Sequence, residues 1–187
     1  MAFFGALVLA AAIAATQSAD AAFAAGHRSR GLAGGWGQGW PYAVPGWGKT
    51  RSDISFIAFH PRMGWFVTDR LELYGEATLL LYHRPAPAVS AGLGGLAGRL
   101  YWSTHRTWVP YATLGAGLLW TSLDVREIDR IFNFQIFYGA GVRQVKRRGP
   151  GLMIELRNHH ISNAGTRGSN LGVNALTLLA GVEWTLR

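Results

Sequence analysis

The chain has no cysteine among its 187 residues, and only 15 % of its residues are charged. The lack of thiols excludes a disulfide scaffold, a thiolate zinc site and a cysteine nucleophile. An average globular chain is about 25 % charged. The low charge, combined with a hydrophobic content of 49 %, excludes a disordered protein. The 25 glycines follow no period of three, which excludes collagen. The length predicts one domain.

Long hydrophobic runs are also scarce, and the one that exists lies at the N-terminus. Residues 2–16 read AFFGALVLAAAIAAT, and two A-x-A patterns follow at 19–21 and 22–24. This organisation is typical of a secretory signal peptide, although no Lys or Arg precedes the run. The alternative, a membrane anchor helix, needs about 20 apolar residues, which is more than the run supplies. We therefore expect residues 1–24 to be a signal peptide and residues 25–187 to form a single domain.

The rest of the apolar content is dispersed with a period of two residues. The segment 71–82, LELYGEATLLLY, alternates aliphatic residues with Glu, Tyr and Thr, and similar alternation recurs in 108–120, 132–143 and 174–186. No stretch after residue 50 shows a helical period of 3.6. Two all-β architectures produce this alternation. A soluble sandwich buries the apolar face, whereas a membrane barrel turns it to lipid and keeps polar residues inside.

The strand lengths and the aromatic positions favour the membrane barrel. The alternating segments are longer than the usual soluble strand of about 5–6 residues and close to the roughly 9–11 residues that span a bilayer. Tryptophans at the strand ends would form interfacial girdles, namely Trp65, Trp102, Trp108, Trp120 and Trp184. We expect strands at 31–40, 52–60, 71–83, 88–102, 108–120, 132–146, 150–162 and 173–187. The predicted fold is all-β, an eight-stranded antiparallel transmembrane β-barrel of a Gram-negative outer membrane, with its interior filled by side chains.

The segment 155–165, ELRNHHISNAG, contains the residues most suited to chemistry. His160 and Ser162 are two residues apart, so in a strand they project from one face. A histidine beside a serine is the minimal pair of base and nucleophile. The two residues share parity with the aliphatic side chains of 152–156, which places them on the lipid-facing side. A polar pair there suits a substrate that is itself a membrane lipid.

Asn174 opens the last predicted strand and has the same outward parity. If residues 163–172 connect the last two strands, Asn174 lies beside His160 and can hold the imidazole by accepting its N–H, as a triad requires. A simpler interpretation is that His160 and the nearby asparagines only solvate a turn, because His-x-Ser also occurs by chance. Residues of the opposite parity are expected inside the barrel. There Glu155 and Arg157 would form an ion pair, and His159 a hydrogen bond.

A resemblance adds to this interpretation. The run His160-Ile161-Ser162-Asn163-Ala164-Gly165, followed by Asn170-Leu171-Gly172-Val173-Asn174, resembles the signature of the PagL-type lipid A 3-O-deacylases, of the acyloxyacyl hydrolase type. Segments 132–134 and 139–143 are similar too. The resemblance implies a serine esterase of the outer membrane that removes the 3-O-linked acyl chain from the lipid A of lipopolysaccharide.

Carried over to this sequence, the resemblance makes Ser162 the nucleophile and His160 the base. The backbone N–H of Gly165 and the side chain of Asn170 would contribute to the oxyanion hole, and Asn163 would support the site. The family pattern has a Glu where this chain has Asn174. In a serine protease the loss of the corresponding carboxylate lowers the rate by up to ~10⁴.

Two alternatives remain beside the esterase. One is a catalytically weak or inactive structural barrel of the outer membrane, and the other is a soluble periplasmic lipid-binding barrel. The net charge of +8 does not separate esterase from inert barrel, because the basic run 146–148 suits either lipid phosphates or a solvated turn. We expect no nucleic-acid partner for an exported chain. We expect no metal and no cofactor, because the six histidines lack ligand spacing. The oligomeric state is left open, a homodimer included.

Overall fold

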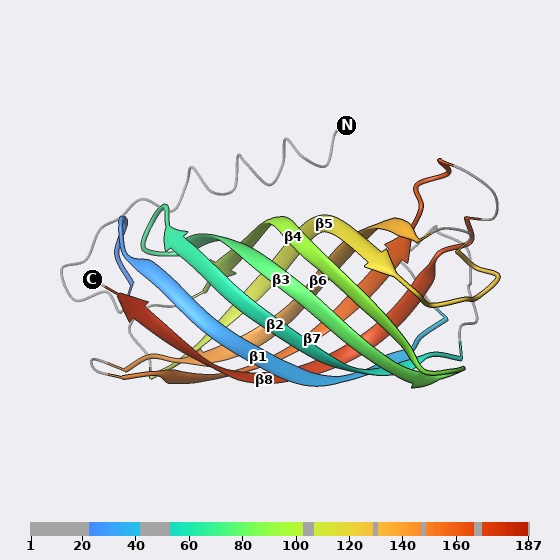
Figure 1. Cartoon of the computed structure of the whole chain (residues 1–187). Coiled ribbons are helices and arrows are strands. Elements are labelled where there is room, and N and C mark those ends of the chain that lie inside the picture. Colours follow the sequence, from blue (N-terminus) through green and yellow to red (C-terminus); the bar gives the residue numbers. More distant parts are fainter. Residues whose placement is uncertain are drawn as a thin grey trace.

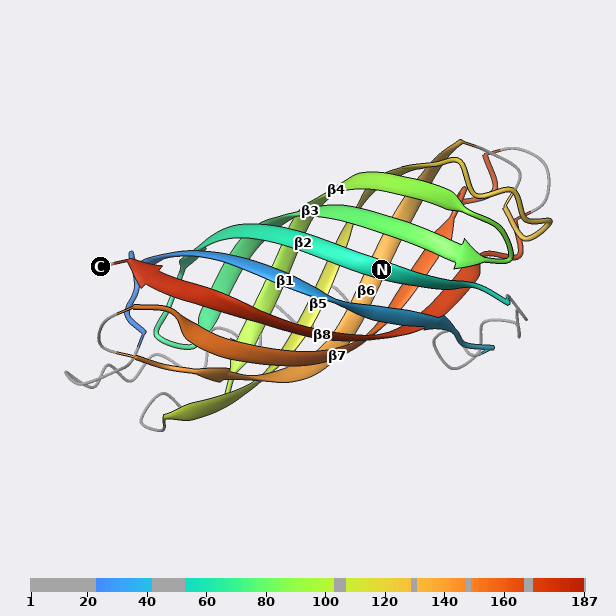
Figure 2. The same ribbon diagram turned by 60° about the horizontal axis from the view of Figure 1, so that its bottom comes forward.

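The computed structural model describes residues 23–41, 53–102, 107–128, 131–146, 149–166 and 170–186. Over these residues the chain forms a closed barrel in which each strand pairs antiparallel with its neighbours in sequence and β8 pairs with β1 (Figure 1). The strands are β1 (Arg28–Gly39), β2 (Ser55–Phe66), β3 (Leu71–Arg84), β4 (Ala88–Tyr101), β5 (Trp108–Thr121), β6 (Phe132–Gln144), β7 (Gly151–Ser162) and β8 (Val173–Leu186). In the rotated view, β1 lies between β2 and β8 and closes the wall (Figure 2). The predicted fold is confirmed.

The largest difference from the predicted strand bounds concerns β2, which continues to Phe66 instead of ending at residue 60. The cause is Pro61, which has no backbone N–H and favours the end of a strand. The β2–β3 ladder has no pairs at His60 and Pro61, but Pro61 still pairs with Leu32 of β1. Because β2 also pairs with β1, and this ladder continues through Pro61, β2 extends beyond the proline. Residues 1–22, 52 and 187, parts of the predicted signal peptide and strands, lie outside the described residues.

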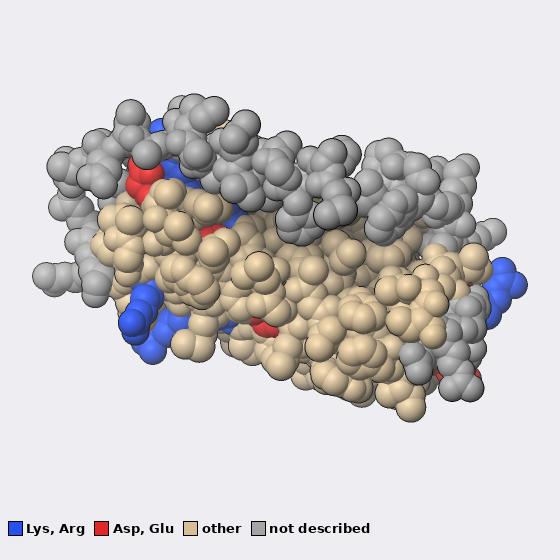
Figure 3. All heavy atoms as spheres, turned by 90° about the horizontal axis from the view of Figure 1, so that it is seen from above, with Lys and Arg blue, Asp and Glu red and all other residues tan. Residues whose placement is uncertain are grey.

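The burial of the strands is the reverse of that in a soluble sandwich. In β3, Glu72, Glu76 and Thr78 are buried, whereas Leu79 and Leu81 are exposed. On the face seen in Figure 3, most blue Lys and Arg atoms lie toward one end of the molecule, and uncharged side chains cover most of the middle. In a soluble protein, leucines exposed to water and glutamates buried in the core would both destabilise the folded state. The same arrangement is stable when lipid surrounds the wall.

The interior is filled by a network of charged side chains with equal numbers of both signs. Its members are Arg62, Arg99, Arg143, Arg157, Glu72, Glu76, Glu155 and Glu183. The predicted pair is present, because Arg157 Nε donates to Glu155 Oε1 at 2.6 Å. His159 also lies inside, with Nε2 3.0 Å from Gln135 Oε1. A filled interior of this kind leaves no pore.

Exposed tryptophans lie at both ends of the barrel. Of the five expected there, Trp65, Trp102 and Trp108 lie at one end and Trp120 at the other, each about half exposed. Trp184, near the end of β8, is less exposed than these four, and Trp40, which was not among the five, is exposed at the same end as Trp120. Such girdles mark the two membrane–water interfaces. With the apolar wall between them, they identify the chain as an outer-membrane barrel.

No helix in the described part of the chain has the length and apolar character needed to cross a membrane.

The two ends of the barrel differ in the length of their connections. The connections beside the end of β7 span residues 40–54, 85–87, 122–131 and 163–172, and those at the opposite end span 67–70, 102–107 and 145–150. Outer-membrane barrels have long extracellular loops and short periplasmic turns. The end of β7 therefore faces the cell exterior, and the start of β1 and the end of β8 face the periplasm.

Candidate active site

Strand β7 places His160 and Ser162 on the outer surface of the barrel. Leu152, Ile154 and Leu156 on the same parity are about half exposed to the lipid side. His160 and Ser162 continue this row at the extracellular end and are partly exposed. The polar pair thus stands at the level where the outer leaflet meets water, on the face that the strand period predicts.

His160 is held by a neighbour on β8. The register of β7 and β8 pairs His160 with Asn174, and the distance from His160 Nδ1 to Asn174 Oδ1 is 2.7 Å. Asn174 is 1 % exposed, so its amide is shielded from water. A carbonyl oxygen only accepts, so Nδ1 carries the proton and donates, and the lone pair of the ring is on Nε2. This is the tautomer that a general base needs.

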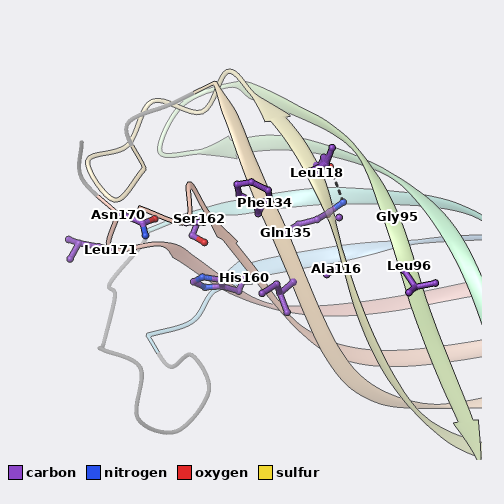
Figure 4. A pocket seen from close by; sticks show the side chains of 13 residues that line it. Gly95, Leu96, Ala116, Leu118, Phe134, Gln135, His160, Ser162, Asn170 and Leu171 are labelled. Atoms are coloured by element: carbon purple, nitrogen blue, oxygen red, sulfur yellow. Dashed lines mark hydrogen bonds between the residues drawn. The ribbon is translucent and has the colours of Figure 1, made fainter. Parts of the chain in front are cut away.

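Ser162 lies next to His160 along the strand. Figure 4 shows its hydroxyl on the side of the strand that faces the imidazole. Among the described residues, no hydrogen bond joins Ser162 Oγ to another group. Contacts between base and nucleophile often close only when substrate is bound. The arrangement therefore places a hydroxyl and an imidazole on one face of β7, beside the same groove.

The chain turns sharply after Ser162, and Asn163 holds the turn. Ala164 and Gly165 have φ values of 53° and 71°, and Thr166 N donates to Asn163 O at 3.1 Å. Positive φ at both central positions defines a type I′ turn, which an alanine rarely enters. The buried Asn163 side chain accepts the Gly165 N–H at 2.9 Å. In this conformation the Gly165 N–H already has a partner, so its place in an oxyanion hole stays a prediction.

The amide of Asn170 is oriented by the same turn. Asn163 N donates to Asn170 Oδ1 at 3.0 Å, which leaves Asn170 Nδ2 as the donor on the other side. The 122–131 connection holds Asn170 in place. Ile128 forms a β-bridge with Asn170, and Gly172 N donates to Glu127 O at 3.1 Å. Asn170 lines the same groove as Ser162, and its Nδ2 can donate a hydrogen bond to a developing oxyanion.

Gly172 is a further residue of the site, and strand parity does not predict its role. Its φ is +74°, and a Cβ at this position would lie 2.5 Å from His160 Cε1 and 3.2 Å from His160 Nε2. The imidazole therefore packs directly on the glycine backbone. In the sequence, the only sign of this role is a glycine two residues before Asn174. Its contact with His160 depends on the path of the 163–172 connection into β8.

An apolar groove of about 930 Å³ runs along the outer wall from the site (Figure 4). Besides the site residues, its lining comes from three strands, with Gly95, Leu96, Ala116, Gly117, Leu118, Phe134 and Ile136 among its residues. The lining is aliphatic, aromatic or small, apart from Gln135 and the polar groups of the site. The part of the lining from β4 and β5 does not follow from the sequence, because strand parity relates a residue only to its own strand and the neighbouring one.

A β-bulge shapes the far side of the groove. The β4–β5 register shifts between Leu93 and Leu96, and the adjacent residues Gly95 and Leu96 are both exposed. Opposite the bulge, a Cβ on Gly117 would lie 2.1 Å from Leu93 O and 2.5 Å from Gly94 Cα. The backbone of the bulge therefore occupies the space that a side chain at residue 117 would need. Bulges commonly redirect the wall beside active sites.

No group of three or more His, Cys, Asp or Glu side chains is placed to hold a metal ion within the described ranges. The chemistry that the described groups can perform is proton transfer and nucleophilic attack, with an amide donor beside the nucleophile.

Comparison with known families identifies the relatives of this site. The family model described as lipid A 3-O-deacylase (PagL) matches residues 35–183. The chain belongs to this family. The matched segment includes His160, Ser162 and Asn174, and the resemblance noted in the sequence is thereby confirmed at the level of the family. A search of curated proteins finds no match.

Solved structures match the fold. The crystal structure of the outer-membrane enzyme PagL is 18 % identical, with a TM-score of 0.57, and the match covers 82 % of this chain and 97 % of that one. Neisserial surface protein A (NspA) is 14 % identical, with a TM-score of 0.58 and coverages of 85 % and 96 %. The outer-membrane protein OprG from Pseudomonas aeruginosa is 11 % identical, with a TM-score of 0.50 and coverages of 90 % and 100 %. At these identities the three structures support the barrel architecture only.

Proposed function

We propose that this barrel is a serine esterase that removes the 3-O-linked acyl chain from lipid A in the outer leaflet. The observation that carries the proposal is the hydrogen bond of 2.7 Å between His160 and Asn174 on the lipid-facing wall, two residues from Ser162 and beside an apolar groove. A lipid-facing surface gives such a polar group no packing role. Membership of the lipid A 3-O-deacylase family agrees with this reaction.

In the proposed mechanism, Ser162 Oγ attacks the ester carbonyl carbon, and His160 Nε2 accepts the proton of the Ser162 hydroxyl. Asn170 Nδ2 stabilises the oxyanion that forms, joined by the Gly165 N–H if that group leaves Asn163. The tetrahedral species then breaks the bond to the sugar oxygen, which leaves with the proton from His160. A water molecule, activated by His160, hydrolyses the acyl–Ser162 ester. The products are a free fatty acid and lipid A with a 3-hydroxyl.

Asn174 keeps His160 in the required tautomer throughout this cycle. Unlike a carboxylate, its neutral amide adds no charge to stabilise the imidazolium. We therefore propose that the enzyme is active but slower than a barrel of the same geometry with an acid at this position.

The groove supplies the binding site for the acyl chain. A lipid in the outer leaflet already lies parallel to the barrel wall, so its chain enters the groove from the side without leaving the membrane. Burial of the chain against the lining residues then positions the ester beside Ser162, which lowers the entropic cost of the attack.

Mass spectrometry of lipid A tests the proposal. Cells that produce the wild-type barrel should lose one 3-hydroxy fatty acid from lipid A, whereas cells that produce Ser162→Ala should keep it. The variant should still show heat-modifiable migration on a gel, because a partly exposed hydroxyl contributes little to stability. Unchanged lipid A in cells with folded wild-type barrel would favour the inactive structural barrel. Equal deacylation by the variant would remove Ser162 from the mechanism.

A further inference from the structure

The periplasmic end of the barrel is closed by a side chain that precedes the first strand. Phe23 is fully buried, and its ring stacks on Phe66 with centroids 4.5 Å apart. The Tyr101 centroid lies 4.6 Å away, and Arg143 Cζ lies 5.1 Å above the Phe23 ring. These partners come from β2, β4 and β6, so the ring is enclosed by widely separated strands.

The backbone after Phe23 is tied to the end of β2. Gly26 N donates to Phe66 O at 2.8 Å, and Phe66 N donates to His27 O at 2.8 Å. His27 N donates to Ala24 O at 3.0 Å, and Gly26 has a φ of 85°. The left-handed glycine and these bonds turn the chain into the barrel mouth, which leads Phe23 to its position between the rings.

Phe23 covers the periplasmic end of the interior network of charged side chains. Arg143, over whose guanidinium it packs, also contacts Glu183 at 3.1 Å and donates to Thr185 at 2.9 Å and to Tyr101 at 3.3 Å. An aromatic ring at this place keeps water from the last charged pair of the network. Removal of the ring would open the cluster to the periplasm.

The buried position of Phe23 distinguishes between the two A-x-A patterns as cleavage sites. Cleavage after residue 24 would remove Phe23 together with Ala24, the acceptor for His27. Cleavage after residue 21 retains both. We propose that the signal peptide ends at Ala21 and not at residue 24, the end expected from the sequence alone. The mature chain then begins at Ala22, and Phe23 is a structural plug of the mature barrel.

The processing step is the hydrolysis of one peptide bond. Water adds across the Ala21–Ala22 bond, which leaves a carboxylate on Ala21 of the leader and an amine on Ala22 of the barrel. The small residues Ala19 and Ala21 fit the A-x-A requirement of a signal peptidase.

The first test is the intact mass of the barrel purified from outer membranes. The expected mass is that of residues 22–187, and the mass of residues 25–187 would overturn the proposal. Two precursor variants check the site directly. Ala21→Tyr blocks the proposed site and should cause unprocessed precursor to accumulate, whereas Ala24→Tyr blocks the other site and should be processed at residue 22 as before. The opposite result would place the cut after Ala24.

The second test concerns the plug. Phe23→Ala should be processed normally but should unfold at a lower temperature than wild type in detergent, and Phe23→Leu should recover part of the loss. Phe59→Ala, which removes an equal ring from the outer wall, serves as the control and should lower the unfolding temperature less. If Phe23→Ala unfolds no earlier than wild type, Phe23 is not a plug. These measurements need no substrate, so they are independent of the proposed esterase activity.

Discussion

At the scale of single residues, the orientation of His160 by Asn174 is the feature most open to experiment. We expect Asn174→Ala to lower kcat strongly and to change KM little, because orientation is felt mainly in the transition state. A loss of about 10²-fold corresponds to a misplacement of about 1 Å. Asn174→Glu should preserve or raise kcat, because a carboxylate stabilises the imidazolium. Kinetics on purified lipid A would measure both, and an unchanged kcat in Asn174→Ala would show that another group orients His160.

Gly172 permits a second prediction at this scale. In Gly172→Ala the new Cβ overlaps His160 Cε1, so the ring must move and the deacylation rate should fall at least tenfold. The substitution also strains the backbone at φ +74°, which costs about 1 kcal/mol. Gly149→Ala is the matched control, because it has a φ of +76° and nothing within 4 Å of the new Cβ. If both variants lose activity equally, strain and not ring displacement is responsible.

The sequence predicted part of this site because strand parity is local. Two-residue spacing is sufficient to place His160 and Ser162 on one face, and a plausible connection length is sufficient to set Asn174 beside them. The contact of Gly172 with the imidazole and the bond from Asn163 to Asn170 arise in a connection without a period. Such contacts follow only from the folded path of the chain.

At the scale of the strands, the bulge in β4 controls the groove. Gly95 lines the groove, and a Cβ there meets nothing within 4 Å. Gly95→Leu should therefore fold normally but occupy space that the acyl chain needs. We expect a several-fold rise in KM for long-chain substrates and little change for short-chain esters. Gly75→Leu is the control, because its Cβ is equally open and it lies outside the groove. Equal kinetics of the two variants on long chains would place the acyl chain elsewhere.

The strands themselves were predictable where alternation is regular. The predicted bounds of β3 to β8 lie within two residues of those observed, because each of these segments alternates along most of its length. The exceptions have local causes. Pro61 interrupts one ladder of β2, and the adjacent glycines 94 and 95 break the period of β4 without indicating a bulge.

At the scale of the whole molecule, the interior and the wall have separate tasks. The interior is filled by ion pairs that connect distant strands, so the barrel is a rigid scaffold with no pore. The proposed catalytic groups lie on the outside, where a lipid of the surrounding membrane can reach the groove directly. The proposed reaction therefore needs no opening in the wall, and stability and activity should be separable properties.

That separation gives the last prediction. Glu155 contacts Arg62 at 3.2 Å, Arg99 at 3.7 Å and Arg157 at 2.6 Å, all in the interior. Glu155→Ala leaves these guanidiniums partly uncompensated, and the breaking of a buried ion pair costs about 3–5 kcal/mol. The variant should unfold at markedly lower temperature or denaturant concentration, as heat-modifiable migration would report.

The fraction that remains folded should nevertheless deacylate lipid A at the wild-type rate per molecule, because Glu155 faces away from Ser162 and His160. Asp53→Ala removes an exposed carboxylate instead and should change the stability by no more than about 0.5 kcal/mol. A loss of specific activity in folded Glu155→Ala would mean that the interior network also positions the outer site. In that case scaffold and site would be coupled through β7, whose alternate residues belong to both.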